Sequence, residues 1–369
     1  MSAAMPAILV APVTVSPTKP LTPTHVKHLL VTDALCRATA GIADVECVYD
    51  HLAYAPAGQT VAFWEYLDRT WPGRDFAAAT EEEIGELYVR HHAEPGPAAD
   101  DRLAPYVERV RAERWLHPSA RRVLDIWRGH YGTLNLFDPR LGEQGPPVLP
   151  VPELIERLAA RDLAIDGRPV GGPVYLDLSA QGIPLRRLVS PAGQANYLTC
   201  VLGQLLPIAG RYDLVVLIHD PDLREDYVLV QRVLAAFGAQ ATRIEVARVP
   251  LDGVVASSRR GGWAGFTLGA LRGRVDAGDH AFRLALRLYL LAVLGRPNAG
   301  SFRVDELRRW VGRAERLHAG TEAGDVALTP FLRRLARDTR YVDPYRLTAQ
   351  LLTRSGQVPV RQLLDRVYP

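Results

Sequence analysis

The stretch that decides the fold is ILVAPVTVSPTKPLTPTHVKHLL, residues 8–30. Its first part, Ile8 to Val15, is a near-continuous apolar run, which is typical of a central parallel strand buried on both faces. A turn rich in Pro and Thr follows, and a helical pattern then runs from His25 to about Ala40. The next strand candidate, Asp44 to Leu52, completes a β-loop-α-β unit. This order predicts the opening unit of a doubly wound parallel sheet.

The rest of the chain predicts the remaining parts of an α/β protein. A helical insertion, with a capping-box start at Thr80 and Glu83, separates two halves of a Rossmann-like sheet. We expect the second half to contain strands at 174–178, 184–190, 212–219 and 242–249, with a helix at 226–238 before the last strand. The predicted organisation is residues 1–52 for the first half of the sheet, 53–170 for the mainly helical insertion, 171–295 for the second half and 296–369 for an Arg-rich helical module.

Composition excludes several classes of protein. Of the 369 residues 48% are hydrophobic and 23% charged, which is ordinary for a globular protein and excludes global disorder. The 44 basic and 41 acidic residues give a net charge of +3, too small for nucleic-acid binding by bulk electrostatics. Three cysteines without metal-ligand spacing, no signal-peptide pattern and no long apolar span predict a cytoplasmic protein without a metal site, DNA partner or membrane partner.

Two segments predict a site for phosphate groups. The helix that starts near His25 offers free backbone N–H groups and a positive dipole end, and His28 lies three residues further along. The second segment is the polar loop DGVVASSRRGGW, residues 252–263, which supplies hydroxyls, two arginines and mobile glycines. Taken alone, helix histidines are more often caps or surface residues, and such a loop is usually a solvent-exposed connection.

These segments together resemble the catalytic core of class I aminoacyl-tRNA synthetases, most closely arginyl-tRNA synthetase. Residues 20–28, with Pro20, Pro23, His25 and His28, resemble the HIGH signature, and VASSRRGG at 255–262 resembles the KMSKS loop. Other segments follow the family's order over roughly residues 8–295: 137–144, 151–172, 196–205, 212–222, 266–271 and 282–291. The resemblance implies a Rossmann-like core and ATP with Mg²⁺ as cofactor.

Departures from the family pattern change what the resemblance implies. All basic residues except Lys19 and Lys27 are arginine. These two stand where the family has an amino-acid-binding asparagine and an adenine-facing glycine, which suggests ammonium groups at the mouth of the site. Ser258 stands where the family has a lysine for pyrophosphate. In the family's YxxxD pattern, which begins here at Tyr197, Val201 replaces the aspartate that holds the substrate guanidinium. Arginine is therefore not the expected substrate, and an apolar, leucine-like amino acid is.

The resemblance, with these departures, implies a set of roles. The expected catalytic residues are His25, Lys27, His28 and Arg259, and the expected cofactor-binding residues are Lys19, Pro20, Ser257, Ser258, Arg260 and Gly261. The expected substrate-binding residues are Gln194, Tyr197, Val201, His219, Asp220 and Asp222. The implied function is an aminoacyltransferase of a specialised, antibiotic-type pathway, which joins an amino acid to a small-molecule amine. Its donor is either an adenylate made from ATP or the acceptor end of charged tRNA. The alternative is a degenerate arginyl-tRNA synthetase paralogue that binds tRNA or an amino acid as a regulator.

Overall fold

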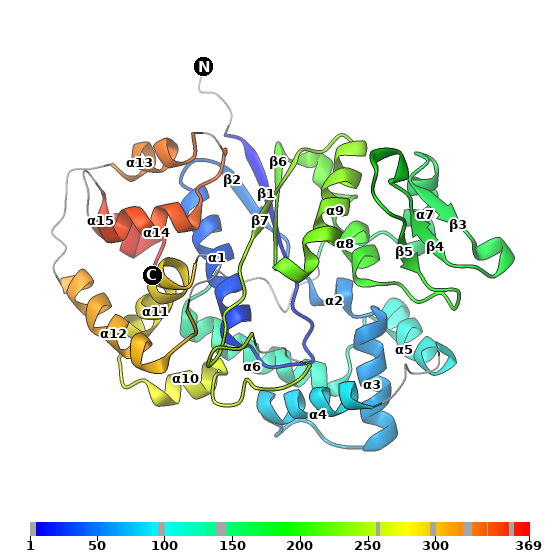
Figure 1. The fold of residues 1–369 in the computed structure, drawn as a ribbon, viewed down its shortest axis with the longest axis horizontal. Helices are drawn as coiled ribbons and strands as arrows, with labels where there is room; N and C mark the ends of the chain where they lie inside the picture. Colours follow the sequence, from blue (N-terminus) through cyan, green and yellow to red (C-terminus); the bar gives the residue numbers. More distant parts are fainter. Residues whose placement is uncertain are drawn as a thin grey trace.

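A four-stranded parallel sheet forms the centre of the protein (Figure 1). The computed structural model describes residues 5–94, 100–137, 145–255, 259–295, 300–319, 327–337, 339–353 and 358–369. The strands are β1 (Ala7–Pro12), β2 (Asp44–Cys47), β6 (Leu214–His219) and β7 (Ala241–Glu245), in the order β2-β1-β6-β7. Strand β1 pairs with both β2 and β6, so it lies inside the sheet. The predicted Rossmann-like parallel sheet is confirmed.

Both faces of β1 are buried, and this explains its continuous apolar run. Ile8 and Val10 belong to a core shared with helix α1 (Pro23–Thr39). Leu9 and Ala11 belong to a second core, shared with helices α8 (Tyr197–Leu205) and α9 (Arg224–Ala236) on the other face. Because successive side chains of a strand point to opposite faces, a strand between two helical layers must be apolar at every position.

Two of the expected strands do not belong to the parallel sheet. Strands β4 (Val174–Leu176) and β5 (Arg186–Val189) pair antiparallel with each other, and β4 also pairs with β3 (Ala164–Asp166) in a separate three-stranded sheet. The expectation that residues 174–178 and 184–190 continue the parallel sheet is therefore wrong. The link from β4 to β5 is shorter than the dozen or so residues that a parallel crossover needs.

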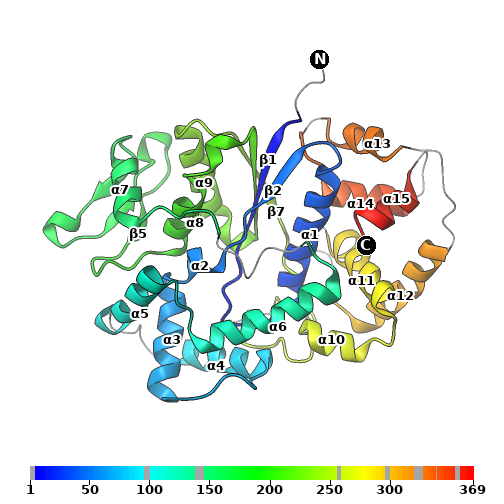
Figure 2. The same cartoon turned by 180° about the vertical axis from the view of Figure 1, so that it is seen from behind.

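A group of helices lies at the carboxyl ends of the parallel strands (Figures 1 and 2). These helices are α3 (Gly58–Thr70), α4 (Glu81–Ala93), α5 (Asp100–Glu113) and α6 (Pro118–Leu134). Helix α2 (His51–Tyr54) precedes them, and α7 (Val151–Ala159) leads into the small sheet. The predicted capping box of α4 is present, because Glu83 N donates to Thr80 Oγ1 at 3.1 Å and Thr80 N to Glu83 Oε2 at 2.9 Å.

The C-terminal part is helical and shares a core with α1. It contains α10 (Leu268–Arg274), α11 (Asp279–Leu288) with a π-helical turn, η5 (Tyr289–Val293), and then α12 (Val304–Ala319), α13 (Leu328–Leu335), α14 (Pro344–Thr353) and α15 (Val360–Arg366). Its buried apolar residues are continuous with those of α1. Of the helices in the described ranges, none is long and apolar enough to span a bilayer.

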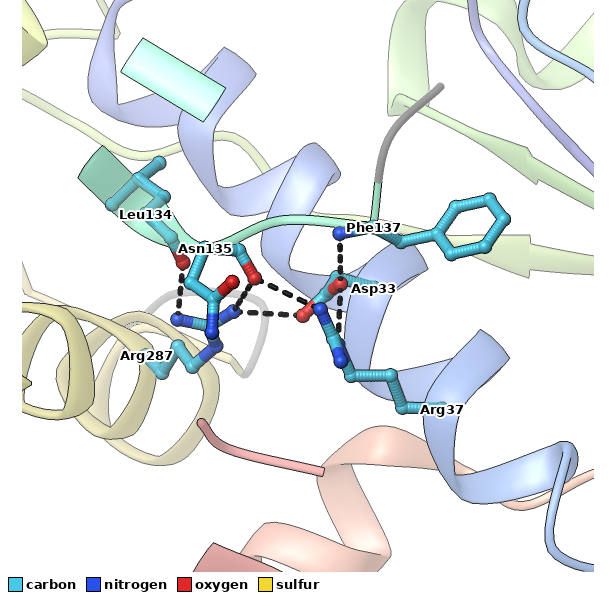
Figure 3. A network of polar contacts seen from close by, with 6 residues as sticks. All are labelled: Asp33, Arg37, Leu134, Asn135, Phe137 and Arg287. Carbon is cyan, nitrogen blue, oxygen red and sulfur yellow. Dashed lines mark hydrogen bonds and ion pairs between the residues drawn. The ribbon is translucent and has the colours of Figure 1, made fainter. Parts of the chain in front are cut away.

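A buried ion pair joins this part to helix α1 (Figure 3). Arg287 of α11 and Asp33 of α1 lie 2.8 Å apart, and their side chains are 0% and 2% exposed. Arg287 also donates to the Leu134 carbonyl at the end of α6, and Asp33 accepts from Phe137 N at 2.8 Å. Three helices that are distant in sequence are thus held by one network of charged groups.

Candidate functional site

Most of the predicted site residues lie at or near the carboxyl ends of β1, β6 and β7. Helix α1 begins after Thr22, with Pro23 at its first turn. His25 Nδ1 accepts a hydrogen bond from Thr22 N at 3.2 Å and lies 3.1 Å from Thr22 Oγ1, so His25 caps its own helix. Because Nδ1 accepts from a backbone N–H, the proton of the neutral ring is on Nε2. His25 therefore caps its own helix and carries its proton on Nε2, beside the Pro20 backbone.

His28 and His219 are two neutral imidazoles at this edge of the sheet. His28 is 7% exposed and neither ring nitrogen makes a hydrogen bond. Burial, with help from the charge of Lys27, lowers the pKa of His28 to about 3. His219, at the end of β6, donates from Nδ1 to the Asp220 carbonyl at 2.9 Å, and its buried Nε2 is unpaired. Burial also lowers the pKa of His219. Both rings offer hydrogen bonds without a positive charge.

Three cationic side chains lie at this edge of the sheet: Lys19, Arg248 and Arg259. Lys19 is half-buried. Burial, followed by repulsion from Arg259 and a smaller repulsion from Arg248, lowers the pKa of Lys19 to about 8. Arg248 pairs with Asp222 at 2.5 Å. Asp220 acts in the opposite direction and raises the pKa of Lys19. Since cations so close together repel each other, the cluster favours a bound anion such as a phosphate or carboxylate.

The loop that follows β7 packs onto helix α4 together with the turn that follows β1. A Cβ atom added at Gly85 of α4 would lie 2.5 Å from Pro20 Cδ and 2.7 Å from the Trp263 ring. Arg259 donates to Gln59 Oε1 at 2.5 Å, which ties the loop to α3. The chain continues through exposed Arg260 and through Gly261, whose φ of +78° suits glycine. Ser257 and Ser258 lie outside the described residues.

A cleft of about 560 Å³ lies beside this cluster. Gln194 and Tyr197, two of the expected substrate-binding residues, line one wall at the start of α8. Helices α3 and α4 supply the opposite wall through Gln59, Thr60 and His92. Gln59 also accepts the hydrogen bond from Arg259, so the cleft adjoins the loop. Its size is in the range of small-molecule sites.

Lys27 does not lie at the mouth of the site, and this expectation is corrected. The side chain is fully buried, and Nζ donates to the Ala247 carbonyl at 2.7 Å and to the Leu294 carbonyl at 2.6 Å. The ring of Tyr345 lies 5.9 Å from the same nitrogen. Lys27 follows His25 by two residues, and residues two apart on a helix point in different directions.

Val201 is also placed differently from the expectation. It is 2% exposed and packs in the core between the sheet and α8, and it does not line the cleft of Gln194 and Tyr197. All residues of α8 from Leu198 to Leu205 are buried, so the protein encloses this helix on every side. The argument for a leucine-like substrate, which rested on Val201, loses its structural basis.

Sequence reasoning missed three residues of this region. Arg248 follows the carboxyl end of β7, where polar groups of parallel sheets gather, and that position could have identified it. Gln59 and His92 come from helices of the insertion, and no local pattern marks them. Within the described residues, no group of three or more His, Cys, Asp or Glu side chains could hold a metal ion.

Comparison with solved structures places this fold among the aminoacyl-tRNA synthetases. The arginyl-tRNA synthetase of Thermus thermophilus superposes with a TM-score of 0.61 at 16% identity, covering 98% of this chain and 79% of that chain. The Plasmodium falciparum arginyl-tRNA synthetase gives 0.60 at 10% identity, covering 99% and 74%. No family model and no curated protein matches the sequence. At these identities the likeness establishes the fold, which is the synthetase-like fold that the motifs predicted.

Proposed function

We propose that this protein is an aminoacyltransferase on a synthetase-like fold, which joins an activated amino acid to a small-molecule amine. The amine nitrogen attacks the carbonyl carbon of the aminoacyl group, and a C–N bond forms. The bond from that carbon to its oxygen leaving group, a phosphate of AMP or a tRNA ribose, breaks. The nitrogen loses one proton, which goes to solvent when AMP leaves as a phosphate anion and to the ribose oxygen when tRNA leaves with a free hydroxyl, and the other product is the amide.

The observation that carries this proposal is the cationic edge of the sheet. Lys19, Arg248 and Arg259 lie together here, and repulsion from the two guanidinium groups adds to burial in lowering the pKa of Lys19. Neutral donors on His25 and His28 lie among them. A preorganised set of this kind stabilises the charge that develops on an acyl oxygen or a leaving phosphate. Asp220 and Asp222 limit the net charge and are suited to hold an amine or ribose hydroxyls.

The position of Lys27 bears on the choice of donor. By the resemblance, the family rests adenine against a glycine at this position. Here the Lys27 side chain fills the space between α1, Ala247 and Leu294. The glycine backbone against which adenine rests by the resemblance is thus missing from α1, and this substitution favours charged tRNA as the donor over an adenylate made from ATP and Mg²⁺.

The setting that we propose for this reaction is specialised metabolism of the antibiotic type, in the cytoplasm. The three cysteines, Cys36, Cys47 and Cys200, are all buried and free, as expected in a reducing compartment. The acceptor would be a small amine, with the acceptor end of tRNA as the macromolecular partner.

Two assays on the purified chain test the proposal. The first is ATP–pyrophosphate exchange with each of the twenty amino acids, and the second is amide formation from charged tRNA with and without ribonuclease. We expect no exchange, and transfer that ribonuclease abolishes. His25→Ala and His28→Ala should each reduce transfer by about 10² or more. Binding of tRNA or an amino acid without exchange or transfer would instead support the regulatory paralogue.

A further inference from the structure

Polar atoms without partners gather around the cleft between α4 and α8. Gln194 Oε1, Tyr197 Oη and His92 Nε2 are all shielded from water and make no hydrogen bond of normal geometry. All three residues line the cleft. The Tyr197 hydroxyl lies next to that of Tyr227 but outside that geometry. Each unpaired buried group costs about 1–3 kcal/mol, so three around one cleft point to a ligand that pairs with them.

The same three groups are uncharged near neutral pH. Burial, then the charge of His91, lowers the pKa of His92 to about 4, with Arg259 and Lys19 acting in the same direction. Burial raises the pKa of Tyr197 well above its usual value. Gln194 carries no charge at any pH. The charged residues of the cleft are its exposed Glu94 and Arg187, and Glu94 is already paired with Arg69 at 2.8 Å.

We infer that this cleft binds a neutral group that both donates and accepts hydrogen bonds, of the carboxamide or hydroxyl class. An aliphatic side chain would leave Gln194, Tyr197 and His92 unpaired. A guanidinium would be desolvated opposite groups without negative charge, and a carboxylate, which only accepts hydrogen bonds, would leave the acceptor Gln194 Oε1 unpaired. The inference rests on the proposed function, because it assigns the polar end of either the donor amino acid or the acceptor to this cleft.

The sequence alone favoured an apolar ligand, whereas the unpaired polar groups around the cleft favour a polar one. Val201, which suggested a leucine-like side chain, lies in the core and does not line the cleft, whereas Gln194, Tyr197 and His92 do. Neighbouring polar groups are committed elsewhere: Asn196 Oδ1 caps α8 through Thr199 N at 2.9 Å, and Ser190 Oγ accepts from Gln194 N at 3.1 Å. The hydrogen-bonding atoms without a partner are therefore those of Gln194, Tyr197 and His92.

Isothermal titration calorimetry on the full chain tests this assignment. L-glutamine, L-leucine and L-arginine probe the amino acid as the source of the group, and D-glucosamine probes the acceptor. We expect L-glutamine or D-glucosamine to bind at least tenfold more tightly than L-leucine and L-arginine. Equal or tighter binding of L-leucine or L-arginine overturns the inference, as does the absence of binding by both neutral polar probes at millimolar concentration.

Two variants separate ligand recognition from folding. Gln194→Leu should weaken binding of the preferred probe about tenfold or more, while the Tm stays unchanged or rises because an unpaired buried atom is removed. Gln181→Leu is the matched control, because Gln181 is exposed in the 3₁₀ turn between β4 and β5, and this variant should bind the probe as the unmodified chain does. Unchanged binding by Gln194→Leu contradicts the inference. Selective binding that depends on Gln194, in a chain without any transfer activity, would contradict only the proposed function.

Discussion

The Lys27 ammonium lies 2.6 Å from the carbonyl oxygen of Leu294, at the end of the π-helical turn. Its second bond goes to Ala247, directly after strand β7. One side chain of the HIGH-like helix thus holds both the strand that leads into the Arg259 loop and the C-terminal helices. The C-terminal part is therefore coupled mechanically to the start of α1, where the cationic cluster lies.

Lys27→Met should destabilise the protein by about 1–3 kcal/mol, because two buried carbonyls lose their donor. Urea unfolding at pH 7 measures this difference. The penalty should grow with pH. Burial lowers the pKa of Lys27 to about 8, whereas the unfolded side chain titrates near 10.5. A base whose folded pKa is lowered destabilises the fold below about pH 8, and that cost disappears as pH rises toward 10.5.

Unfolding of both proteins at pH 7 and at pH 10 therefore provides the check. The native chain should gain stability relative to Lys27→Met over this interval. A constant difference between the two proteins would mean that Lys27 is not desolvated as described.

Gly85→Ala should separate the two segments that meet on α4. The added Cβ overlaps Pro20 and Trp263, so we expect a loss of about 1–3 kcal/mol and weaker binding of anions at the Lys19 cluster. Gly129→Ala in α6 is the matched control, because no atom lies within 4 Å of its added Cβ. That control should be neutral or stabilising by up to about 1 kcal/mol. Similar Tm values for the two variants would disprove the close packing at Gly85.

Removal of one partner from the Asp33–Arg287 pair should be costly. Asp33→Asn leaves the buried guanidinium without its counter-charge, and we expect a loss of about 3–5 kcal/mol in urea unfolding. Asp305→Asn breaks an exposed pair with Arg308 and should cost less than 1 kcal/mol. The double variant Asp33→Leu with Arg287→Met should recover much of the loss. If Asp33→Asn behaves like Asp305→Asn, the network does not support the fold.

How much the sequence predicts depends on whether a pattern is local. The continuous apolar run of residues 8–15 predicts a strand buried on both faces because burial acts on every side chain along it. The short segments at 174–178 and 184–190 carry no local sign of their partners, and pairing between distant strands determined which sheet they joined. The same holds at the site. His25 and Arg259 follow from their motifs, whereas His92 reaches the cleft only because α4 packs against the loop.

Lys27 and Val201 show a second limit of sequence reasoning. A motif gives the order of residues, but the direction of each side chain follows from the helix and its neighbours. Position 27 points toward the C-terminal helices and position 201 toward the core, so substitutions there reshape packing as well as the ligand site. A role inferred from a family position is therefore reliable only where the side chain reaches the same space.

His28 should make the protein sensitive to acid. Burial lowers its pKa to about 3 in the folded chain, while the unfolded imidazole titrates near 6.5. The unfolded state therefore takes up a proton between these values and the folded state does not. The stability that His28 contributes is present above about pH 6.5 and is lost as pH falls, by about 1.4 kcal/mol per pH unit. Urea unfolding at pH 7, 6 and 5 should show this loss.

His28→Asn carries no titrating group and isolates the effect from the other buried histidines. Relative to this variant, the native chain should lose about 2 kcal/mol between pH 7 and pH 5, from the slope of 1.4 kcal/mol per unit below pH 6.5. Parallel curves for the native chain and His28→Asn would mean that His28 is protonated in the fold. The neutral donor assigned to it at the edge of the sheet would then be a cation.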